Sequence, residues 1–476
     1  MRILLVKPKA RLASILGLQA FQMLEPLELA YLAAVVPAAH EVRILDLRLR
    51  RFADAAFRRE LARFRPDVVG ITGYTHESSR VKVLAATVRA ALPQAFVVVG
   101  GHHATVAPQD YDLPQIDCIV RGAGCGPFAA IVEHLARGER PRGVPNVLLT
   151  GADFDAAATE EWPRFPDPAT LPFPRRELYD GSRYRSVWVT ETPKDWETIF
   201  PPVAMVRTSF GCRMKCSFCI VPFLCGGKHM PRPADVVAEE IARLPARHVY
   251  FADDENFIDE GFAFELADAL AARGVRKRYF AWTRSTTVNR CPELFRRWRE
   301  LGLDGAFLGF EFPTDEQLKR ARKGASVADN ERAHRTLREL GIAVHAAFMV
   351  TPECDESDFA LLADYVRAMP PAQCSVTVCT PSPGTPSYGE IERAIWVDNP
   401  HDLHDCMHPL TPTKLPLRRF CELFAAQARL GESKTPLRAA QRPLPPKDIV
   451  RVVMASRRYH RAFREMFRDY PRELWD

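Results

Sequence analysis

Four cysteines lie within fourteen residues of one another in the stretch TSFGCRMKCSFCIVPFLCGGK, residues 208–228. The first three, Cys212, Cys216 and Cys219, are spaced C-x3-C-x2-C. A structural zinc site takes four protein ligands, usually from two C-x2-C pairs that are far apart in sequence. Three closely spaced thiolates can instead hold three corners of a cubane iron–sulfur cluster. The spacing therefore predicts a cluster in which one iron stays open to a small chelating molecule.

The neighbouring residues bear on this interpretation. Cys225 follows the third cysteine by six residues, beyond Pro222, and could occupy the remaining corner. Three reduced core cysteines that share this spacing by coincidence are the other alternative. Gly211 permits a tight turn into the loop, and Phe218 offers an apolar shield beside the last cysteine. These two residues favour the cluster.

The composition is that of a globular protein. A chain of 476 residues, 47% hydrophobic and 26% charged, is expected to form roughly two to four domains. Residues 1–12 hold too short an apolar run for a signal peptide, and no apolar stretch is long enough to span a membrane, so we expect a cytoplasmic protein. Reduced thiols in that compartment argue against disulfides. Most of the other cysteines are expected to be small buried residues: Cys118, Cys125, Cys291, Cys354, Cys374, Cys379, Cys406 and Cys421.

The first part of the chain alternates short buried strands with helices. Strands are expected at residues 2–6, 42–45, 68–72, 96–100 and 118–121, with helices at 27–36, 53–64, 78–91 and 127–136. These βα units predict a doubly wound, five-stranded parallel sheet, a Rossmann-like domain over residues 1–138. Ligands of such sheets bind at the carboxyl ends of the strands. No G-x-G-x-x-G follows the first strand, so a dinucleotide site is not expected.

A second βα series follows a linker that is rich in proline and charge, residues 139–202. Its strands are expected at residues 203–208, 248–251, 278–282, 305–310, 344–350 and 375–379, with helices such as 233–244 and 356–368. Six units without a clear seventh or eighth predict an open partial (β/α)6 barrel of the TIM type over residues 203–390. The cysteine loop follows its first strand, at the edge where the active sites of such barrels lie.

The C-terminal region, residues 391–476, is expected to be mostly helical. From Glu432 to Asp476 there are eleven Lys or Arg against six Asp or Glu, which gives this tail +5 of the net +6. An amphipathic helix is expected over residues 446–476, with basic residues opposite its apolar ones: Ile449, Val452, Val453, Tyr459, Phe463, Met466, Phe467 and Tyr470. A solvated helix face is the simplest reading of the charge, and contact with anionic lipid or nucleic acid is the alternative.

The motifs together resemble a known family. C-x3-C-x-Φ-C after the first strand of a partial barrel resembles the radical S-adenosylmethionine (SAM) superfamily. The five-stranded domain, with GGHHATVAP at its fourth strand, is similar to the cobalamin-binding domain of the B12-dependent branch. The resemblance covers nearly the whole chain. It implies that three thiolates hold a [4Fe–4S] cluster, and that SAM chelates the open iron and is cleaved to a 5′-deoxyadenosyl radical.

The resemblance also implies which residues contact SAM. Phe218 lies in the cluster loop, and Asp253 and Asp254, in YFADDENF after the second strand, resemble the acidic motif near the SAM amino group. Arg284 ends the third strand and suits the SAM carboxylate, and Glu311 ends the fourth and suits the ribose. A solvated acidic loop and structural ion pairs remain the alternatives for these residues.

Cobalamin contacts are implied at the carboxyl ends of the first sheet: Thr72, Gly73, Tyr74, Gly100, Gly101, His102, Thr105 and Gly122. His102 and His103 are expected to shape the loop or touch the corrin rather than bind cobalt. The cobalt-binding motif D-x-H-x-x-G does not occur, and Asp402-Leu403-His404 lies outside the first predicted domain. The resemblance thus implies cobalamin without a protein histidine on cobalt, which favours methyl transfer. The turn Gly122–Gly126 departs from the family's G-E-G-E-like pattern, and this places the contacts there in question.

The implied reaction moves a methyl group from methylcobalamin to an unactivated carbon after the 5′-deoxyadenosyl radical removes a hydrogen. It requires electrons from a reductase, flavodoxin or ferredoxin. Within the branch, YFADDENFID, RYFAWTRSTTV and HPLTPTKLPLRRF most resemble the hopanoid C-3 methylases, whose substrate is a flat membrane triterpenoid. The basic C-terminal helix would suit peripheral contact with the inner membrane face, and a helix packed on the barrel is the alternative.

Two rival functions remain open. One is a cobalamin-dependent radical SAM cyclase or rearrangement enzyme that transfers no methyl group. The other is a regulatory protein that senses cobalamin or carries an iron–sulfur cluster, with its basic tail on nucleic acid. The three-cysteine arrangement and the lack of a recognisable DNA-reading module oppose the second, so no nucleic-acid partner is expected. No catalytic residue beyond the cofactor ligands is predicted.

Overall fold

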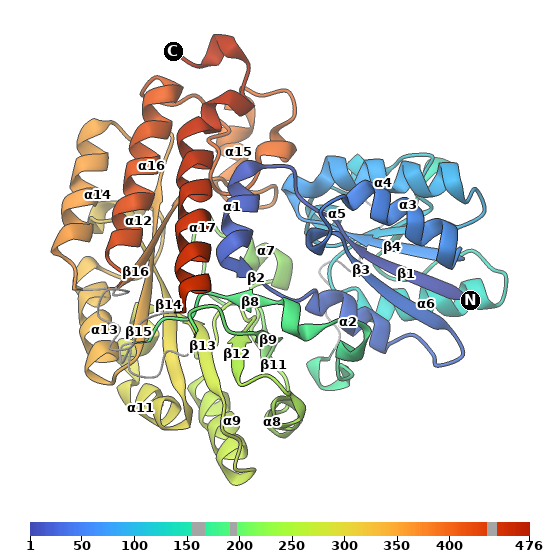
Figure 1. The fold of residues 1–476 in the computed structure, drawn as a ribbon, viewed down its shortest axis with the longest axis horizontal. Coiled ribbons are helices and arrows are strands. Elements are labelled where there is room, and N and C mark those ends of the chain that lie inside the picture. The colour runs from blue at the N-terminus through green and yellow to red at the C-terminus, as the bar shows by residue number, and fades with distance from the viewer. Residues whose placement is uncertain (155–166, 191–197, 371, 436–444) are drawn as a thin grey trace. The chain divides into compact units, whose positions relative to one another are not determined.

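The computed structural model describes residues 1–154, 167–190, 198–370, 372–435 and 445–476. The chain divides into two compact units (Figure 1). Unit 1 comprises Met1–Leu12, Pro26–Asp180 and His401–His404, and unit 2 comprises Ala13–Glu25, Gly181–Pro400 and Asp405–Asp476. Each unit is built on its own parallel sheet. No helix among the described residues combines the length and the apolar character needed to cross a bilayer.

Unit 1 contains the predicted doubly wound sheet. Five parallel strands lie in the order β3-β1-β4-β5-β6: Glu41–Asp46, Arg2–Lys7, Val68–Thr72, Phe96–Gly100 and Cys118–Val120. A sixth strand that the sequence pattern does not predict, β7 (Val147–Leu149), pairs antiparallel with β6. It lies in the residues predicted as a linker. Its three residues stand among prolines and charged residues, a composition that favours a linker.

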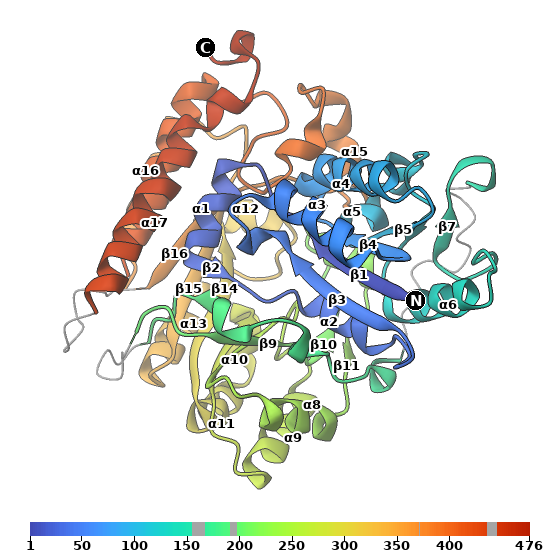
Figure 2. The same cartoon turned by 45° about the vertical axis from the view of Figure 1, so that its right-hand side comes forward.

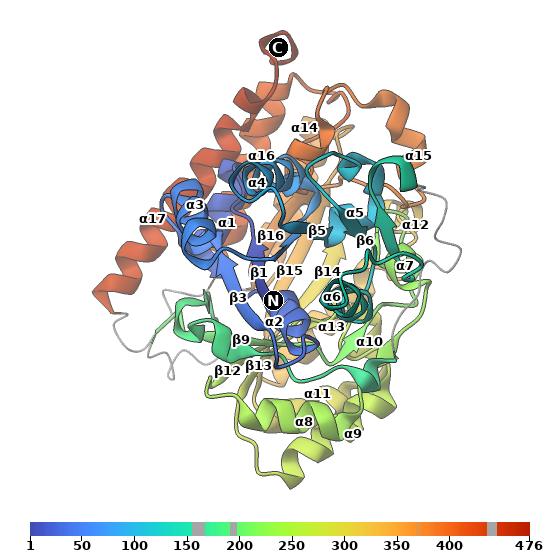
Figure 3. The same cartoon turned by 90° about the vertical axis from the view of Figure 1, so that its right-hand side faces the viewer.

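Helices cover both faces of this sheet (Figure 3). One face packs against α3 (Ala53–Phe64) and α4 (Ser78–Ala91), and the other against α2 (Leu27–Ala34) and α6 (Cys125–Ala136). The strands are buried on both sides, which explains why they read as continuous β-branched runs instead of alternating ones. The short helix α5 (His102–Val106) follows β5 directly.

Unit 2 is the predicted open barrel of six βα units. Its parallel sheet has the order β16-β15-β14-β13-β12-β9, so β9 and β16 form the two edges (Figure 1). In chain order the strands are Val203–Val206, His248–Phe251, Arg278–Thr283, Leu303–Glu311, Ala343–Val350 and Gln373–Val378. The principal helices between them are α8 (Ala234–Arg243), α9 (Glu260–Ala272), α11 (Pro292–Leu301), α13 (Val327–Glu339) and α14 (Glu356–Ala368).

Two long helices end the chain and lie side by side (Figure 2): α16 (Leu417–Ser433) and α17 (Pro446–Glu465). A helix that the sequence pattern does not predict, α1 (Ala13–Phe21), packs on α17 within unit 2. The contact is close at Gly17, where a Cβ atom would lie 3.1 Å from the Tyr459 Cα. The last helix therefore takes its apolar partners from the start of the chain as well as from α16.

Two expectations about the C-terminal region are wrong. The segment around Asp402-Leu403-His404 belongs to compact unit 1, although it is far from the first sheet in sequence. In α17, Ile449 and Val453 do not share the buried face, because they are 48% and 43% exposed. The buried face uses Ala455 and Ala462 together with Phe463, which was among the predicted apolar residues. The period of the helix is as predicted, and Val452 packs against the buried cluster of Val189, Ile199 and Phe200, but Ile449 and Val453 in the same half face outward.

Candidate active site

The cysteine loop is closed at its base by a short antiparallel pairing. Ser209–Phe210 (β10) pairs with Met230–Pro231 (β11), so the two ends of the loop lie side by side. Gly211, the first residue after β10, has φ +80°, and a Cβ there would lie 2.3 Å from the Lys228 carbonyl oxygen and 2.8 Å from the Cys225 sulfur. Only glycine fits a backbone with this φ and this clearance. The tight turn expected at this position is present.

The three cysteines of the motif lie on the closed loop between β10 and β11. Cys216 is buried, and Cys212 and Cys219 are partly exposed. Burial, together with the charges of the two other thiols, raises the pKa of Cys219 to about 12. As thiolates, three cysteines on one loop would need positive charge beside them, which the irons of a cluster would supply. The donor set and its surroundings therefore fit a three-cysteine cluster.

Cys225 is turned away from such a role. It ends the short helix α7 (Val221–Cys225) and is 3% exposed. Its thiol donates to the Cys212 carbonyl oxygen with the sulfur 3.6 Å away, and the same sulfur closes the space beside Gly211. The contacts are those of a packing residue behind the loop.

The two aspartates after β12 hold the strand end and the loop together. Asp253 accepts hydrogen bonds from the Thr208 amide at 2.7 Å, from the Thr208 hydroxyl and from the Ser209 hydroxyl at 2.8 Å. Asp254 accepts from Arg207 at 2.8 Å and from the Gly211 amide at 2.9 Å. Neither aspartate lies in a solvated acidic loop. Their positions are those of loop anchors, and their carboxylates are occupied by protein donors.

Arg284 connects the third strand to the cysteines. Its guanidinium lies with Nη1 3.5 Å from the Cys216 sulfur and also donates to the Lys323 carbonyl oxygen. It is 7% exposed. A buried guanidinium beside a sulfur stabilises the thiolate form. The structure thus places Arg284 next to the motif, where its partners are the Cys216 sulfur and the Lys323 carbonyl oxygen.

Glu311 forms an ion pair with Lys323, the residue whose carbonyl oxygen accepts from Arg284. Its carboxylate lies 2.5 Å from the Lys323 ammonium, and its backbone has φ +62° at an irregularity in the pairing of β14 with β15. Gly309 makes room for this pair, because a Cβ there would lie 2.7 Å from the Lys323 nitrogen. Phe218 lies nearby in sequence to the cluster cysteines and packs against the apolar group of Phe312, Leu318, Ala321 and Met349.

One acidic residue stands out that was not predicted as a contact. Glu255 is 2% exposed, accepts a hydrogen bond from the Thr283 hydroxyl at 3.0 Å and has no partner for Oε2 within the described part of the chain. Burial raises its pKa to about 7, although Thr283 and Arg284 act in the opposite direction. A buried carboxyl with an unsatisfied oxygen is suited to an incoming cation. Glu255 belongs to the acidic stretch YFADDENF, but the sequence of three adjacent acidic residues does not reveal which of them lacks a protein partner.

The residues predicted to contact cobalamin converge at one edge of the sheet of unit 1. Thr105 donates to the Gly101 carbonyl oxygen at 2.9 Å and accepts from the Gly122 amide at 2.8 Å, so it joins the ends of β5 and β6. Gly101 has φ +98°, and a Cβ there would lie 2.6 Å from the Thr72 hydroxyl and 2.9 Å from the Gly73 nitrogen. Gly100 lies directly before it, at the end of β5.

The same edge presents an aromatic and an imidazole ring. Tyr74 is 53% exposed, and the Lys7 ammonium lies 4.5 Å from its ring centroid. His102 Nδ1 lies 3.2 Å from the Thr75 hydroxyl, and burial lowers the pKa of His102 to about 4. A neutral imidazole and an exposed ring beside glycine backbone suit the polar and apolar parts of a flat cofactor. The edge therefore fits cobalamin in its chemistry.

Comparisons with known proteins agree with both units. The model of the B12 binding domain matches residues 13–132, and the model of the Radical SAM superfamily matches residues 206–366. The hopanoid C-3 methylase of Methylococcus capsulatus is 32% identical over 408 residues, which are 84% of this chain and 75% of that protein. This chain belongs to the cobalamin-binding radical SAM family.

The chain is also similar to a cyclase of the same family and to a solved methyltransferase structure. The anaerobic magnesium-protoporphyrin IX monomethyl ester cyclase of Cereibacter sphaeroides is 28% identical, over 71% of this chain and 55% of that protein. The solved radical SAM methyltransferase TsrM from Kitasatospora setae has the same fold, with a TM-score of 0.61 at 20% identity over 83% of this chain and 77% of that one. Because the methylase of Methylococcus capsulatus is 32% identical over 84% of this chain, the chain is a cobalamin-dependent radical SAM methyltransferase, with a [4Fe–4S] cluster, SAM and cobalamin as cofactors.

The position of Cys225 gives a first prediction. We expect Cys225→Ser to keep the iron and sulfide content of the reconstituted wild-type protein, because its sulfur packs behind the loop, whereas Cys216→Ser loses the cluster. Iron and sulfide assays with low-temperature electron paramagnetic resonance measure this, and addition of SAM should change the spectrum of Cys225→Ser as it changes that of wild type. Equal loss in both variants would show that Cys225 is a ligand.

The buried carboxyl of Glu255 gives a second prediction. Its pKa is raised to about 7 from an ordinary 4.5, so the folded state binds more protons than the unfolded state between these values. The free energy of unfolding should therefore fall as pH rises from about 4.5 to about 7. Glu255→Gln should remove this decline and weaken SAM binding by the reconstituted enzyme.

Denaturant titrations at several pH values and calorimetric SAM titrations measure these effects. The matched control is Glu265→Gln on the exposed side of α9, which should behave as wild type in both. An unchanged pH dependence in Glu255→Gln would contradict the assignment.

Proposed function

We propose that this methyltransferase adds a methyl group to an unactivated carbon of a hopanoid-type triterpenoid lipid. The observation that carries the proposal is the 32% identity to a hopanoid C-3 methylase over 84% of the chain. When bound, the cluster and cobalamin supply the electron that cleaves SAM and the methyl group that is transferred. The residues of the chain have to hold these groups, orient SAM and keep the reacting carbon dry.

The cluster ligands in this proposal are Cys212, Cys216 and Cys219. The Arg284 guanidinium beside the Cys216 sulfur supports the thiolate charge and leaves its unpaired Nε near the place where the SAM carboxylate would arrive. Glu255 would take the SAM ammonium, because its Oε2 is the buried acceptor that protein donors leave open. Asp253 and Asp254 would act through the loop that they anchor, as positioning residues.

The cobalamin contacts in this proposal are the residues that line the edge of β4, β5 and β6. Thr105 fixes the Gly101 and Gly122 backbones at a set spacing. Tyr74 and His102 present rings at the same edge, with centroids 6.3 Å apart. The neutral state of His102 suits contact with the corrin or its amide side chains, since an imidazolium would carry a charge into a largely apolar contact.

A labelled cofactor tests the function directly. Anaerobic enzyme, reconstituted with cluster and cobalamin, is given a hopanoid-containing lipid extract, reduced flavodoxin and SAM with a trideuterated methyl group. We expect a product hopanoid that carries the trideuteromethyl group, together with 5′-deoxyadenosine, by mass spectrometry. Formation of 5′-deoxyadenosine with an unlabelled, altered lipid would favour a cyclase or rearrangement, and no change in any lipid would overturn the substrate.

We also propose that α17 collects this lipid at a membrane surface. Its outward stripe carries Ile449, Val450, Val453 and Met454 in the first half of the helix, all 43% to 67% exposed. Exposed arginines continue the stripe in the second half: Arg457, Arg458, Arg461 and Arg464. Apolar residues that insert below headgroups, followed by cations at headgroup level, are the pattern of an interfacial helix.

Changing the two most exposed apolar residues of this stripe gives a third prediction. The double substitution Val450→Asp and Met454→Asp should lower binding to vesicles of anionic phospholipid tenfold or more, since each buried side chain contributes about 1.5 kcal/mol or more. Co-sedimentation measures this, and high salt should weaken wild-type binding as well. The control is Leu361→Asp on α14, where a single leucine is 45% exposed; equal binding by all three proteins would contradict the proposal.

A further inference from the structure

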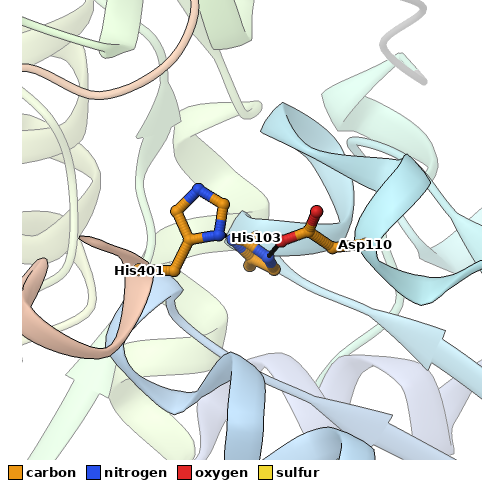
Figure 4. Close-up of side chains that lie close together, drawn as sticks. All are labelled: His103, Asp110 and His401. Atoms are coloured by element: carbon orange, nitrogen blue, oxygen red, sulfur yellow. Dashed lines mark hydrogen bonds and ion pairs between the residues drawn. The ribbon is translucent and has the colours of Figure 1, made fainter. Parts of the chain in front are cut away.

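Two imidazoles and a carboxylate meet in unit 1 outside the residues assigned above. His103 lies on α5, Asp110 on the short helix η3 (Pro108–Tyr111), and His401 on the distant segment Pro400–Leu403 (Figure 4). Asp110 Oδ2 lies 3.0 Å from His103 Nε2 and 2.8 Å from His401 Nδ1. One ligand atom from each residue falls within 4.8 Å of the other two, and no other His, Cys, Asp and Glu side chains of the described residues form such a group.

The two rings share one oxygen atom. His103 is fully buried and lies against Tyr111 and His401, with ring centroids 5.2 Å and 4.7 Å away. Its other nitrogen, Nδ1, has no hydrogen-bond partner among the described residues. Among the described residues, the side-chain polar contact of this buried ring is therefore the one between its Nε2 and Asp110. Asp110 and His401 are 22% and 26% exposed, which leaves a path from solvent to the same point.

The protonation states suit a cation. Burial lowers the pKa of His103, although the hydrogen bond to Asp110 acts in the opposite direction. Hydrogen bonds from His103 and His401 hold the pKa of Asp110 well below its usual range. At neutral pH the site therefore offers a neutral buried imidazole and an ionised carboxylate, the forms in which these groups bind metals.

The spacing also suits a cation. Imidazole nitrogen and carboxylate oxygen bind divalent first-row metals at about 2.1 Å, so two such ligands stand about 3.4 Å apart in a tetrahedral zinc site and about 3.0 Å apart, the shorter edge, at the right angle of octahedral coordination. The separations of 3.0 Å and 2.8 Å from Asp110 Oδ2 match that edge of a coordination shell. Two histidines and one carboxylate on one face leave the other positions to water, as in many sites for divalent first-row metals.

From this geometry we propose that His103, Asp110 and His401 bind a divalent transition-metal ion, with zinc as the ion of choice for a test. The ion fastens the segment Pro400–Leu403 to the residues that follow β5. His401–His404 belongs to unit 1 while the chain on both sides of it belongs to unit 2, so all three ligands lie in one unit. The site is separate from the three cysteines and does not depend on the lipid substrate.

The experiment uses the reconstituted, cobalamin-loaded enzyme, in which the cluster occupies its cysteines. Zinc is added anaerobically, the protein is passed through a column with a weak chelator, and zinc, iron and cobalt are counted by mass spectrometry. We expect about one zinc per chain at unchanged iron content. X-ray absorption at the zinc edge should show nitrogen and oxygen ligands alone. A sulfur shell, or no retained zinc, would overturn the proposal.

Variants assign the zinc to this site. His401→Gln changes a partly exposed residue and should lower zinc affinity tenfold or more, with the cluster and bound cobalamin retained. Asp110→Asn should do the same. His134→Gln is the matched control, because His134 pairs with Glu139 at 3.4 Å on the surface without a second histidine; it should bind zinc as wild type does. Zinc should raise the thermal unfolding temperature of wild type and of the control, but not of His401→Gln. Undiminished zinc binding by both site variants would contradict the proposal and would show that His103, Asp110 and His401 form a hydrogen-bonded triad without a metal.

Discussion

The candidate active site depends on the carboxylate pair that follows β12. Asp253 and Asp254 accept five hydrogen bonds from residues 207–211, the segment that leads from β9 into the cysteine loop. The three donors to Asp253 carry no charge, so burial raises the pKa of Asp253 despite its full set of partners. This arrangement fixes the first residue of the loop relative to the second strand. The loop then begins at the short β10–β11 pairing and at Gly211, where the positive φ and the close neighbours exclude a residue with a Cβ.

The same logic holds in unit 1, where a hydroxyl takes the place of the carboxylates. Thr105 both donates and accepts, and so it spaces the ends of β5 and β6 with one side chain. Gly101 allows the backbone after β5 to approach Thr72 and Gly73 more closely than any residue with a Cβ could. In both units, hydrogen bonds between the ends of neighbouring strands fix the edge of the sheet where a ligand would bind. The groups that would contact the ligand come from the residues next to these hydrogen bonds.

The sequence alone predicts the elements and the cysteine loop well, and the individual contacts poorly. Buried parallel strands have a strong apolar pattern, so both sheets and their order of βα units follow from it. The three-residue β7 and the helix α1 carry no comparable signal. Asp253, Asp254 and Glu255 are adjacent acidic residues of similar chemistry, and only the folded chain shows that two of them are satisfied by backbone and side-chain donors while the third has an open oxygen. His401 is a stronger case, because its partner Asp110 is distant in sequence and no motif links them.

The helix α17 shows how a correct period can lead to a wrong face. Its apolar residues recur at helical spacing from Ile449 to Tyr470, which on a uniform helix would define one buried side. In the structure the buried side is set by α1 and α16, and small residues such as Ala455 and Ala462 occupy it because the helices approach closely. Larger apolar residues of the first turns are then left outside. Exposure of four such side chains in one stripe is unfavourable in water, and the proposed contact with a membrane surface rests on this observation. A triterpenoid substrate would bring the enzyme to such a surface, because it resides in the membrane that the stripe would contact.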